Sequence, residues 1–158
     1  MRTIEIQLFT FPELSETAKE KAIEAYRYGL ETCWGDESLE SIHAFVNHFG
    51  ASLRNWSIGA YAPFDFDCQY FNSHFRGLKL RDFKRDYMPT GYCLDCDLWA
   101  TFYDEFKRTG SAKKAFDAAL YAGFKAWRAD IEWQLSDEAI SETLDCAGYE
   151  FTEAGVMQ

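Results

Sequence analysis

A C-x-x-C segment at residues 93–96 is the first place where residue type and spacing could support chemistry. This spacing occurs in zinc sites and in redox-active cysteine pairs. A zinc site normally needs a second pair of ligands, and the nearest residues, Cys68 and His74, lie upstream with five residues between them. A redox pair would follow a thioredoxin-like strand, which is not found here. We therefore interpret the segment as two small, semi-buried thiols at a helix start, and we predict no metal and no cofactor.

No complete catalytic motif occurs in the rest of the chain. His43 and His48 are five residues apart on one predicted helix, so they face different sides and do not form a natural ligand pair. The H-E-x-x-H, G-x-S-x-G, P-loop and G-x-G-x-x-G patterns are all missing. A catalytic triad assembled only in space stays open, but we predict no catalytic residue.

Two rows of acidic residues recur at helical spacing and are the predicted partner-binding residues. They are Glu16, Glu20 and Glu24 near the start of the chain and Glu138, Glu142 and Asp145 near its end. Four residues rise about 6 Å along a helix, which is close to the phosphate spacing of a nucleic-acid strand. Each row therefore predicts either a phosphate-like surface for a basic groove or an ordinary solvated helix face.

One basic cluster lies in the middle of the chain. It comprises Arg76, Lys79, Arg81, Lys84 and Arg85, interleaved with Phe75, Phe83 and Tyr87. Basic residues mixed with aromatic ones can bind a nucleic-acid strand. Because acidic and aliphatic residues also intervene, a solvated amphipathic segment or a partner for the chain's own acidic helices is an alternative.

The charge balance indicates a basic partner. The chain has 16 Lys and Arg against 26 Asp and Glu, a formal net charge of −10. Such a chain repels nucleic-acid phosphates, so we expect no direct nucleic-acid binding. No signal peptide or stretch of roughly 18 apolar residues is found, so we expect no membrane contact and a location in the cytoplasm. The five cysteines are expected to be reduced there.

Hydrophobic periodicity predicts the elements that must position these residues. The expected helices cover residues 15–31, 37–49, 95–108, 111–135 and 136–147, and a further short helix is possible at 80–87. The expected strands cover residues 3–9, 52–61, 65–71 and 149–152. The helix at 111–135 is expected to bury Phe116, Leu120, Trp127 and Ile131.

The order of these elements predicts the fold class. Strands and helices do not alternate as regular βαβ units, and no linker or repeat divides the chain. We therefore predict an α+β fold in which about five helices pack on a small, mainly antiparallel sheet. Residues 1–158 are expected to form a single domain.

Both ends of the chain resemble small proteins of bacteriophages and prophages. Residues 11–27 follow the pattern F-x-E-L-S-x-x-A-K-x-K-A-I-x-x-Y-R that is common in them, and residues 136–153 are similar to the end of longer members. The resemblance covers about a third of the chain and carries over no catalytic residue. It implies an early or accessory phage gene, and acidic phage proteins of this size include anti-CRISPR and other anti-defence inhibitors.

These observations favour a phage-encoded, non-enzymatic inhibitor acting in the cytoplasm of a host bacterial cell. It would act as a DNA mimic, binding a host protein or ribonucleoprotein of a CRISPR-Cas-like defence complex and blocking nucleic-acid binding. One alternative is an antitoxin-like or regulatory protein-binding module. Another is a small enzyme that uses Cys93, Cys96 or a histidine in a site formed only by the fold.

Overall fold

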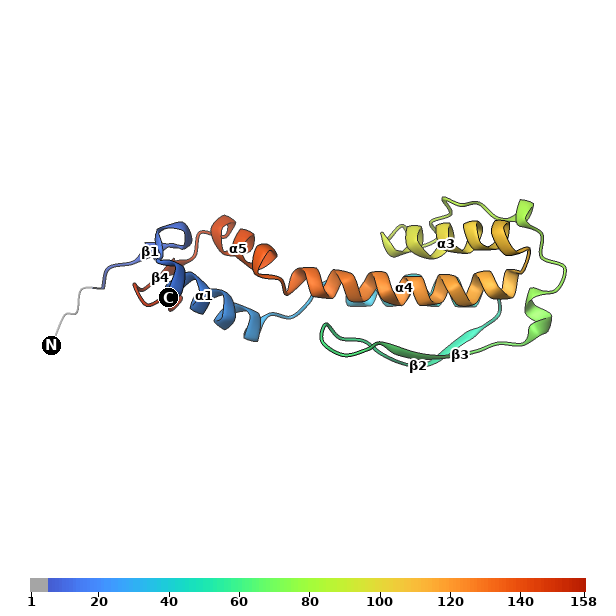
Figure 1. Cartoon of the computed structure of the whole chain (residues 1–158), viewed down its shortest axis with the longest axis horizontal. Helices are drawn as coiled ribbons and strands as arrows, with labels where there is room; N and C mark the ends of the chain where they lie inside the picture. Colours follow the sequence, from blue (N-terminus) through green and yellow to red (C-terminus); the bar gives the residue numbers. More distant parts are fainter. Residues whose placement is uncertain (1–5) are drawn as a thin grey trace. The chain divides into compact units, whose positions relative to one another are not determined.

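The computed structural model describes residues 6–158 and divides into two compact units (Figure 1). Unit 1 joins the two ends of the chain, residues up to Thr32 and Glu132–Gln158, whereas unit 2 is the continuous segment Cys33–Ile131. The described residues form five α-helices and four short strands, and the predicted α+β class is confirmed. That the two units unfold together as one domain stays a prediction.

The helices lie close to the predicted ranges. They are α1 (Glu16–Gly29), α2 (Gly35–His48), α3 (Leu94–Thr109), α4 (Ala112–Gln134) and α5 (Asp137–Cys146). Serine side chains satisfy free backbone N–H groups at three helix starts. Ser15 accepts from Ala18 at 3.3 Å, Ser111 accepts from Lys114 at 3.3 Å and Ser136 accepts from Ala139 at 3.2 Å. The short helix considered for residues 80–87 is limited to the 3-10 turn η3 (Leu80–Asp82).

The strands form two antiparallel pairs instead of one sheet. β1 (Phe9–Thr10) pairs with β4 (Glu150–Phe151), and β2 (Ser52–Ser57) pairs with β3 (Asp65–Gln69). Each pair lies within one unit, because β1 and β4 come from the two ends of the chain. The helices of each unit therefore pack on a two-stranded ribbon of their own.

The predicted strand at residues 3–9 is wrong over most of its described part. Residues 3–5 lie outside the described residues, residues 6–8 are irregular, and pairing begins at Phe9. Ile6 and Leu8 alternate with polar residues as in a strand, but they do not lie in a sheet. Their side chains are 59% and 39% exposed. The reason is the partner strand, because β4 offers only two residues to pair with.

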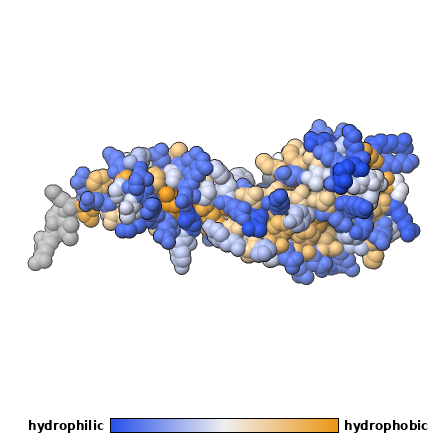
Figure 2. Space-filling view, in the orientation of Figure 1, coloured by the Kyte–Doolittle hydropathy of each residue, from blue (hydrophilic) through white to orange (hydrophobic). Residues whose placement is uncertain are grey.

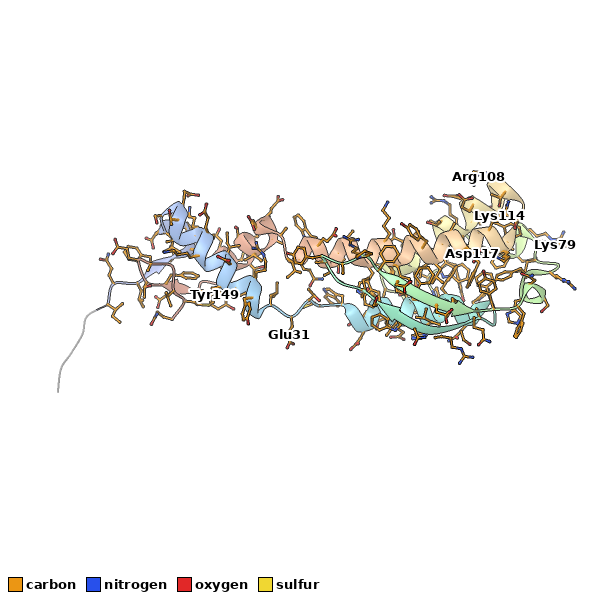
Figure 3. All side chains as sticks on the ribbon, turned by 60° about the horizontal axis from the view of Figure 1, so that its bottom comes forward. Glu31, Lys79, Arg108, Lys114, Asp117 and Tyr149 are labelled. Atoms are coloured by element: carbon orange, nitrogen blue, oxygen red, sulfur yellow. The ribbon has the colours of Figure 1, made fainter. Side chains whose placement is uncertain are left out.

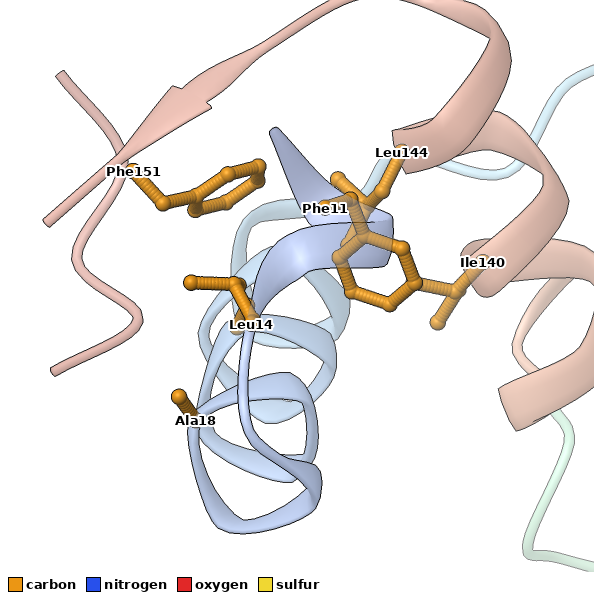
Figure 4. Packing of buried hydrophobic residues seen from close by; sticks show 7 residues of the cluster. Phe11, Leu14, Ala18, Ile140, Leu144 and Phe151 are labelled. Atoms are coloured by element: carbon orange, nitrogen blue, oxygen red, sulfur yellow. The ribbon is translucent and has the colours of Figure 1, made fainter. Parts of the chain in front are cut away.

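Unit 1 has its own small core, shown in Figure 4. Its buried residues come from the 3-10 turn η1 (Phe11–Glu13), α1, α5 and β4, and are Phe11, Leu14, Ala18, Ala22, Ile140, Leu144 and Phe151. Arg27 of α1 ties the two chain ends together at the edge of this core. Its Nε donates to the Leu135 carbonyl at 2.9 Å, and its guanidinium pairs with Asp137.

The last residues fold back on this core through a turn that requires glycine. Gly155 has φ +81, and a Cβ there would lie 2.3 Å from the carbonyl oxygen of Ala18 on α1. The Gly155 N–H donates to the Thr152 carbonyl at 2.9 Å, which closes the turn. Both the backbone angle and the close approach to α1 therefore exclude a side chain.

Unit 2 is organised around α4. Phe116 of α4 stacks on Phe45 of α2 with ring centroids 5.4 Å apart, and Phe124 stacks on Phe66 of β3 at 4.6 Å. On the α3 side, a Cβ on Gly123 would lie 2.5 Å from the Leu98 side chain. This close packing explains a glycine inside a helix, where it costs about 1 kcal/mol relative to alanine.

The apolar face predicted for α4 is confirmed. The exposed fractions are 0% for Phe116, 2% for Leu120, 4% for Trp127 and 8% for Ile131. Phe116 also contacts Phe49 and Phe75, at centroid distances of 5.3 and 5.2 Å. It therefore connects α2, α4 and the turn η2 (Asn72–Phe75) in one aromatic cluster.

We expect Phe116→Ala to lower the free energy of unfolding by about 3–5 kcal/mol, the usual cost of emptying a large aromatic site in a core. Tyr121→Ala is the matched control, since Tyr121 lies on the same helix but is 57% exposed. It should cost less than half as much in chemical denaturation. Equal midpoints for Phe116→Ala and the wild type would contradict this packing.

Candidate partner-binding surface

Net charge is concentrated in unit 1. Its two segments contain 4 Lys and Arg against 13 Asp and Glu, a net charge of −9, while unit 2 has 12 against 13 and a net charge of −1. Residues 132–158 contain seven acidic residues and no Lys or Arg. In Figure 2, hydrophilic residues cover much of the visible face of this unit. The fold thus adds the two acidic ends of the chain together in one unit.

Both predicted acidic rows lie on helices of unit 1, and all six side chains are exposed. Glu16 forms an ion pair with Lys19 at 2.9 Å. Among the described residues, the other five have no ion pair or side-chain hydrogen bond. These five are Glu20, Glu24, Glu138, Glu142 and Asp145. The carboxylates are therefore available to an outside cation.

Each row lies on the side of its helix opposite the core. In α1 the buried positions are Ala18 and Ala22, and a residue two positions away along a helix is turned by about 200°. The same relation separates Glu138 and Glu142 from the buried Ile140 of α5. Because α1 and α5 contact each other, both rows lie on the surface of one helix pair, away from its core.

The two rows differ in how their charges interact with the helix dipole. Glu16 and Glu138 lie in first helical turns, where a negative charge is favourable. Asp145 lies near the C-terminal end of α5, whose last turn has no basic residue, so its charge opposes the dipole at a cost of about 0.3–1 kcal/mol. Helix stability therefore does not explain the whole acidic row of α5.

The basic segment from Arg76 to Arg85 is anchored to unit 2 by its aromatic residues. Phe75 is buried, and Phe83 packs on Phe102 with centroids 4.9 Å apart. Tyr87 contacts Trp99 at 4.8 Å. These rings serve the core instead of forming a stacking platform, which favours the amphipathic interpretation of the segment.

The charged groups of this segment pair within unit 2 or extend into solvent. Arg85 donates two hydrogen bonds to Asp104 of α3, at 2.9 and 3.0 Å, and these lower the pKa of the Asp104 carboxyl. Lys79 has no ion pair among the described residues and is exposed. Figure 3 shows it near Arg108 and Lys114, where α3 ends and α4 begins. Glu105 pairs with Arg108 there and Asp117 pairs with Lys113, so the charge of this end is mixed.

The cysteines of the C-x-x-C segment face solvent, whereas the sequence analysis expected them to be semi-buried. Cys93 and Cys96 are both exposed, so their interpretation as semi-buried thiols is wrong. The buried residues are the two between them, Leu94 at 6% and Asp95 at 0%. At the start of α3, the helical turn places these two residues toward the core and the flanking cysteines toward solvent.

Asp95 holds the loop that precedes α3. Its Oδ2 accepts hydrogen bonds from the Thr90 backbone N–H at 2.8 Å, the Thr90 hydroxyl at 2.9 Å and the Gly91 N–H at 3.0 Å. The Thr90 hydroxyl also lies 3.0 Å from that of Ser41 on α2. This role was not predicted from the sequence, although an aspartate just after a Pro-Thr-Gly turn is a recognisable signal for side-chain hydrogen bonds to the turn backbone.

Neither a metal cluster nor a membrane-spanning helix is found in residues 6–158. No three His, Cys, Asp or Glu side chains of this range are grouped to hold an ion. None of its helices combines the length and the apolar composition that a membrane crossing needs. The absence of a required metal stays a prediction.

We expect Asp95→Ala to destabilise the protein by about 2–4 kcal/mol, because two backbone N–H groups lose their acceptor. Cys93→Ser and Cys96→Ser are the controls from the same segment. Both thiols are exposed, so these changes should stay within about 0.5 kcal/mol in denaturant titrations. The reverse order of effects would mean that the cysteines, and not Asp95, stabilise the segment.

We expect protein purified without chelator to contain well under one zinc ion per chain, because one C-x-x-C offers only two of the four usual ligands. Elemental analysis measures this directly, and Cys93→Ser should leave the zinc content unchanged. Stoichiometric zinc that disappears in Cys93→Ser would identify the two cysteines as ligands.

The comparisons with known proteins assign no family. The chain matches no protein-family model, no curated protein and no solved structure. The resemblance of its ends to phage proteins therefore stays an expectation.

Proposed function

We propose that this protein is a non-enzymatic binding protein whose acidic unit 1 docks on a basic, nucleic-acid-binding surface of another protein. The observation that carries the proposal is the net charge of −9 in unit 1, displayed on exposed carboxylates of α1 and α5. Opposite charge attracts such a surface over about a Debye length, roughly 8 Å in physiological salt. Docking there would block nucleic-acid binding by the partner, because the same surface would be covered.

The phage resemblance gives the finer form of this proposal. In that form the partner is a protein or ribonucleoprotein of a host defence complex of the CRISPR-Cas type, and the protein is an anti-defence inhibitor. An antitoxin-like or regulatory module would use the same electrostatics on a different partner. A partner captured from host lysate distinguishes them, since a basic ribonucleoprotein supports the first and a small basic toxin supports the second.

We expect charge-neutral versions of one acidic row to bind the captured partner at least tenfold more weakly, a loss of about 1.4 kcal/mol. One variant carries Gln at Glu16, Glu20 and Glu24. The other carries Gln at Glu138 and Glu142 and Asn at Asp145. Affinity should also fall as salt rises, mainly through slower association. Nucleic acid should compete with the wild type for the partner.

A matched control separates a local contact from total charge. Changing Glu40, Asp65 and Asp67 to their amides removes three exposed carboxylates of unit 2 and should change affinity less than about twofold. Neither row variant should lose stability, because like charges four residues apart cost about 0.2–0.5 kcal/mol per pair. If both row variants bind as well as the wild type, the acidic surface is not the contact. The basic segment Arg76–Arg85 would then be tested next.

A further inference from the structure

A second feature of the protein lies in unit 2, away from the acidic rows. It is a cavity of about 390 Å³, within the range of small-ligand sites. Residues from the start of α2, the start of α3 and the second half of α4 surround it. The six residues that define its chemistry are Trp34, Tyr92, Trp127, Glu37, Asp97 and Asp130.

Aromatic rings form one part of its wall. Trp127 is buried, while Tyr92 and Trp34 are 36% and 64% exposed. A tryptophan this exposed is available to cover a ligand at the mouth of the cavity.

Three carboxylates and the Ser38 side chain form its polar wall, and no Lys, Arg or His among the described residues lines it. Glu37 and Asp97 lie in first helical turns, where acidic residues often stabilise the helix dipole. Two helix starts supply about +0.5 charge each, against the carboxylates of Glu37 and Asp97, which leaves a balance of about −1. The cavity is therefore negative overall.

The Asp97 side chain is exposed, and partial desolvation by its neighbours raises the pKa of its carboxyl. A positively charged ligand beside it would favour the charged carboxylate. The exposed aromatic rings would add cation–π attraction. Aromatic faces and carboxylates together select a cation with apolar or planar surface over a compact, strongly hydrated ion.

We propose that this cavity binds an organic cation, a guanidinium or alkylammonium group, between the rings of Trp34 and Tyr92 and the carboxylates of Glu37 and Asp97. The group belongs either to a basic side chain of another protein or to a free small molecule. The site does not depend on the acidic rows, so it stands or falls separately from the proposed docking of unit 1.

Calorimetric titration of the full chain with three small probes tests the site. Arginine blocked at both ends represents a protein side chain, agmatine represents a free cation, and blocked citrulline is the uncharged analogue of the first. We expect roughly millimolar affinity for a cation of this size and at least about tenfold weaker binding of citrulline. Tighter binding of blocked arginine indicates a protein side chain, and tighter binding of agmatine indicates a free ligand.

Variants connect the binding to the cavity. Glu37→Gln should weaken cation binding at least about fivefold. Glu40→Gln removes the same charge from the same helix at an exposed position outside the cavity, and it should bind as the wild type does. Trp34→Asn removes the ring at a residue with φ 65, and asparagine tolerates that backbone conformation. It should also weaken binding at least about fivefold.

Three results would overturn the proposal. They are equal binding of arginine and citrulline, no binding of either cation at about 10 mM, and equal losses in Glu37→Gln and Glu40→Gln. Thermal melting checks that each variant is folded. If Trp34→Asn does not fold, the comparison of the two glutamate variants decides.

Discussion

The pairing of the two chain ends is the constraint on which the acidic unit depends. β1 pairs with β4 and α1 contacts α5, although about 100 residues separate the segments. Closing a flexible loop of that length costs about 4 kcal/mol of entropy, apart from a constant. Unit 2 contains its own aromatic core, and within it Gly35 lies beside Trp127, close to the two ends of that segment. Once unit 2 has folded, its two ends are already close together, so most of the loop entropy has been lost. The small core around Phe11 and Ile140 then needs to order only the short remaining segments of unit 1.

This construction also decides where the charge lies. Along the chain, residues 1–32 have a net charge of −2 and residues 132–158 have one of −7, on either side of a nearly balanced middle. In the fold these ends become one unit, so their charges add and repel one another. The pair between Arg27 and Asp137 relieves part of that repulsion while joining α1 to the start of α5. Lys19 relieves Glu16 in the same way, whereas the other five carboxylates of the two rows have no ion pair among the described residues.

Sequence analysis succeeded where structure is local. The helices follow from apolar spacing and from serines such as Ser15 and Ser136, because both signals act within a few residues. The predictions failed where the local structure depends on a segment that is distant in the chain. The alternation of Ile6 and Leu8 resembles a strand, but β4 is too short to pair with them. The exposed Cys93 and Cys96, and the buried Asp95 between them, depend on how α3 is turned toward α2. The cavity beside Trp34 draws on three separate helices, and no sequence spacing could have indicated it.

Both units present carboxylates that attract positive charge, but the surroundings of these carboxylates differ between the units. Unit 1 displays carboxylates on exposed helix faces, where attraction acts over a distance of about 8 Å but distinguishes poorly between basic groups. The cavity of unit 2 places carboxylates beside aromatic rings, where contact range and shape decide which cation fits. Long-range attraction mainly raises the rate of encounter, whereas a fitted pocket mainly slows dissociation. Under the two proposals taken together, the protein would associate rapidly with a basic partner and still discriminate among its side chains, which an acidic helix face alone cannot do.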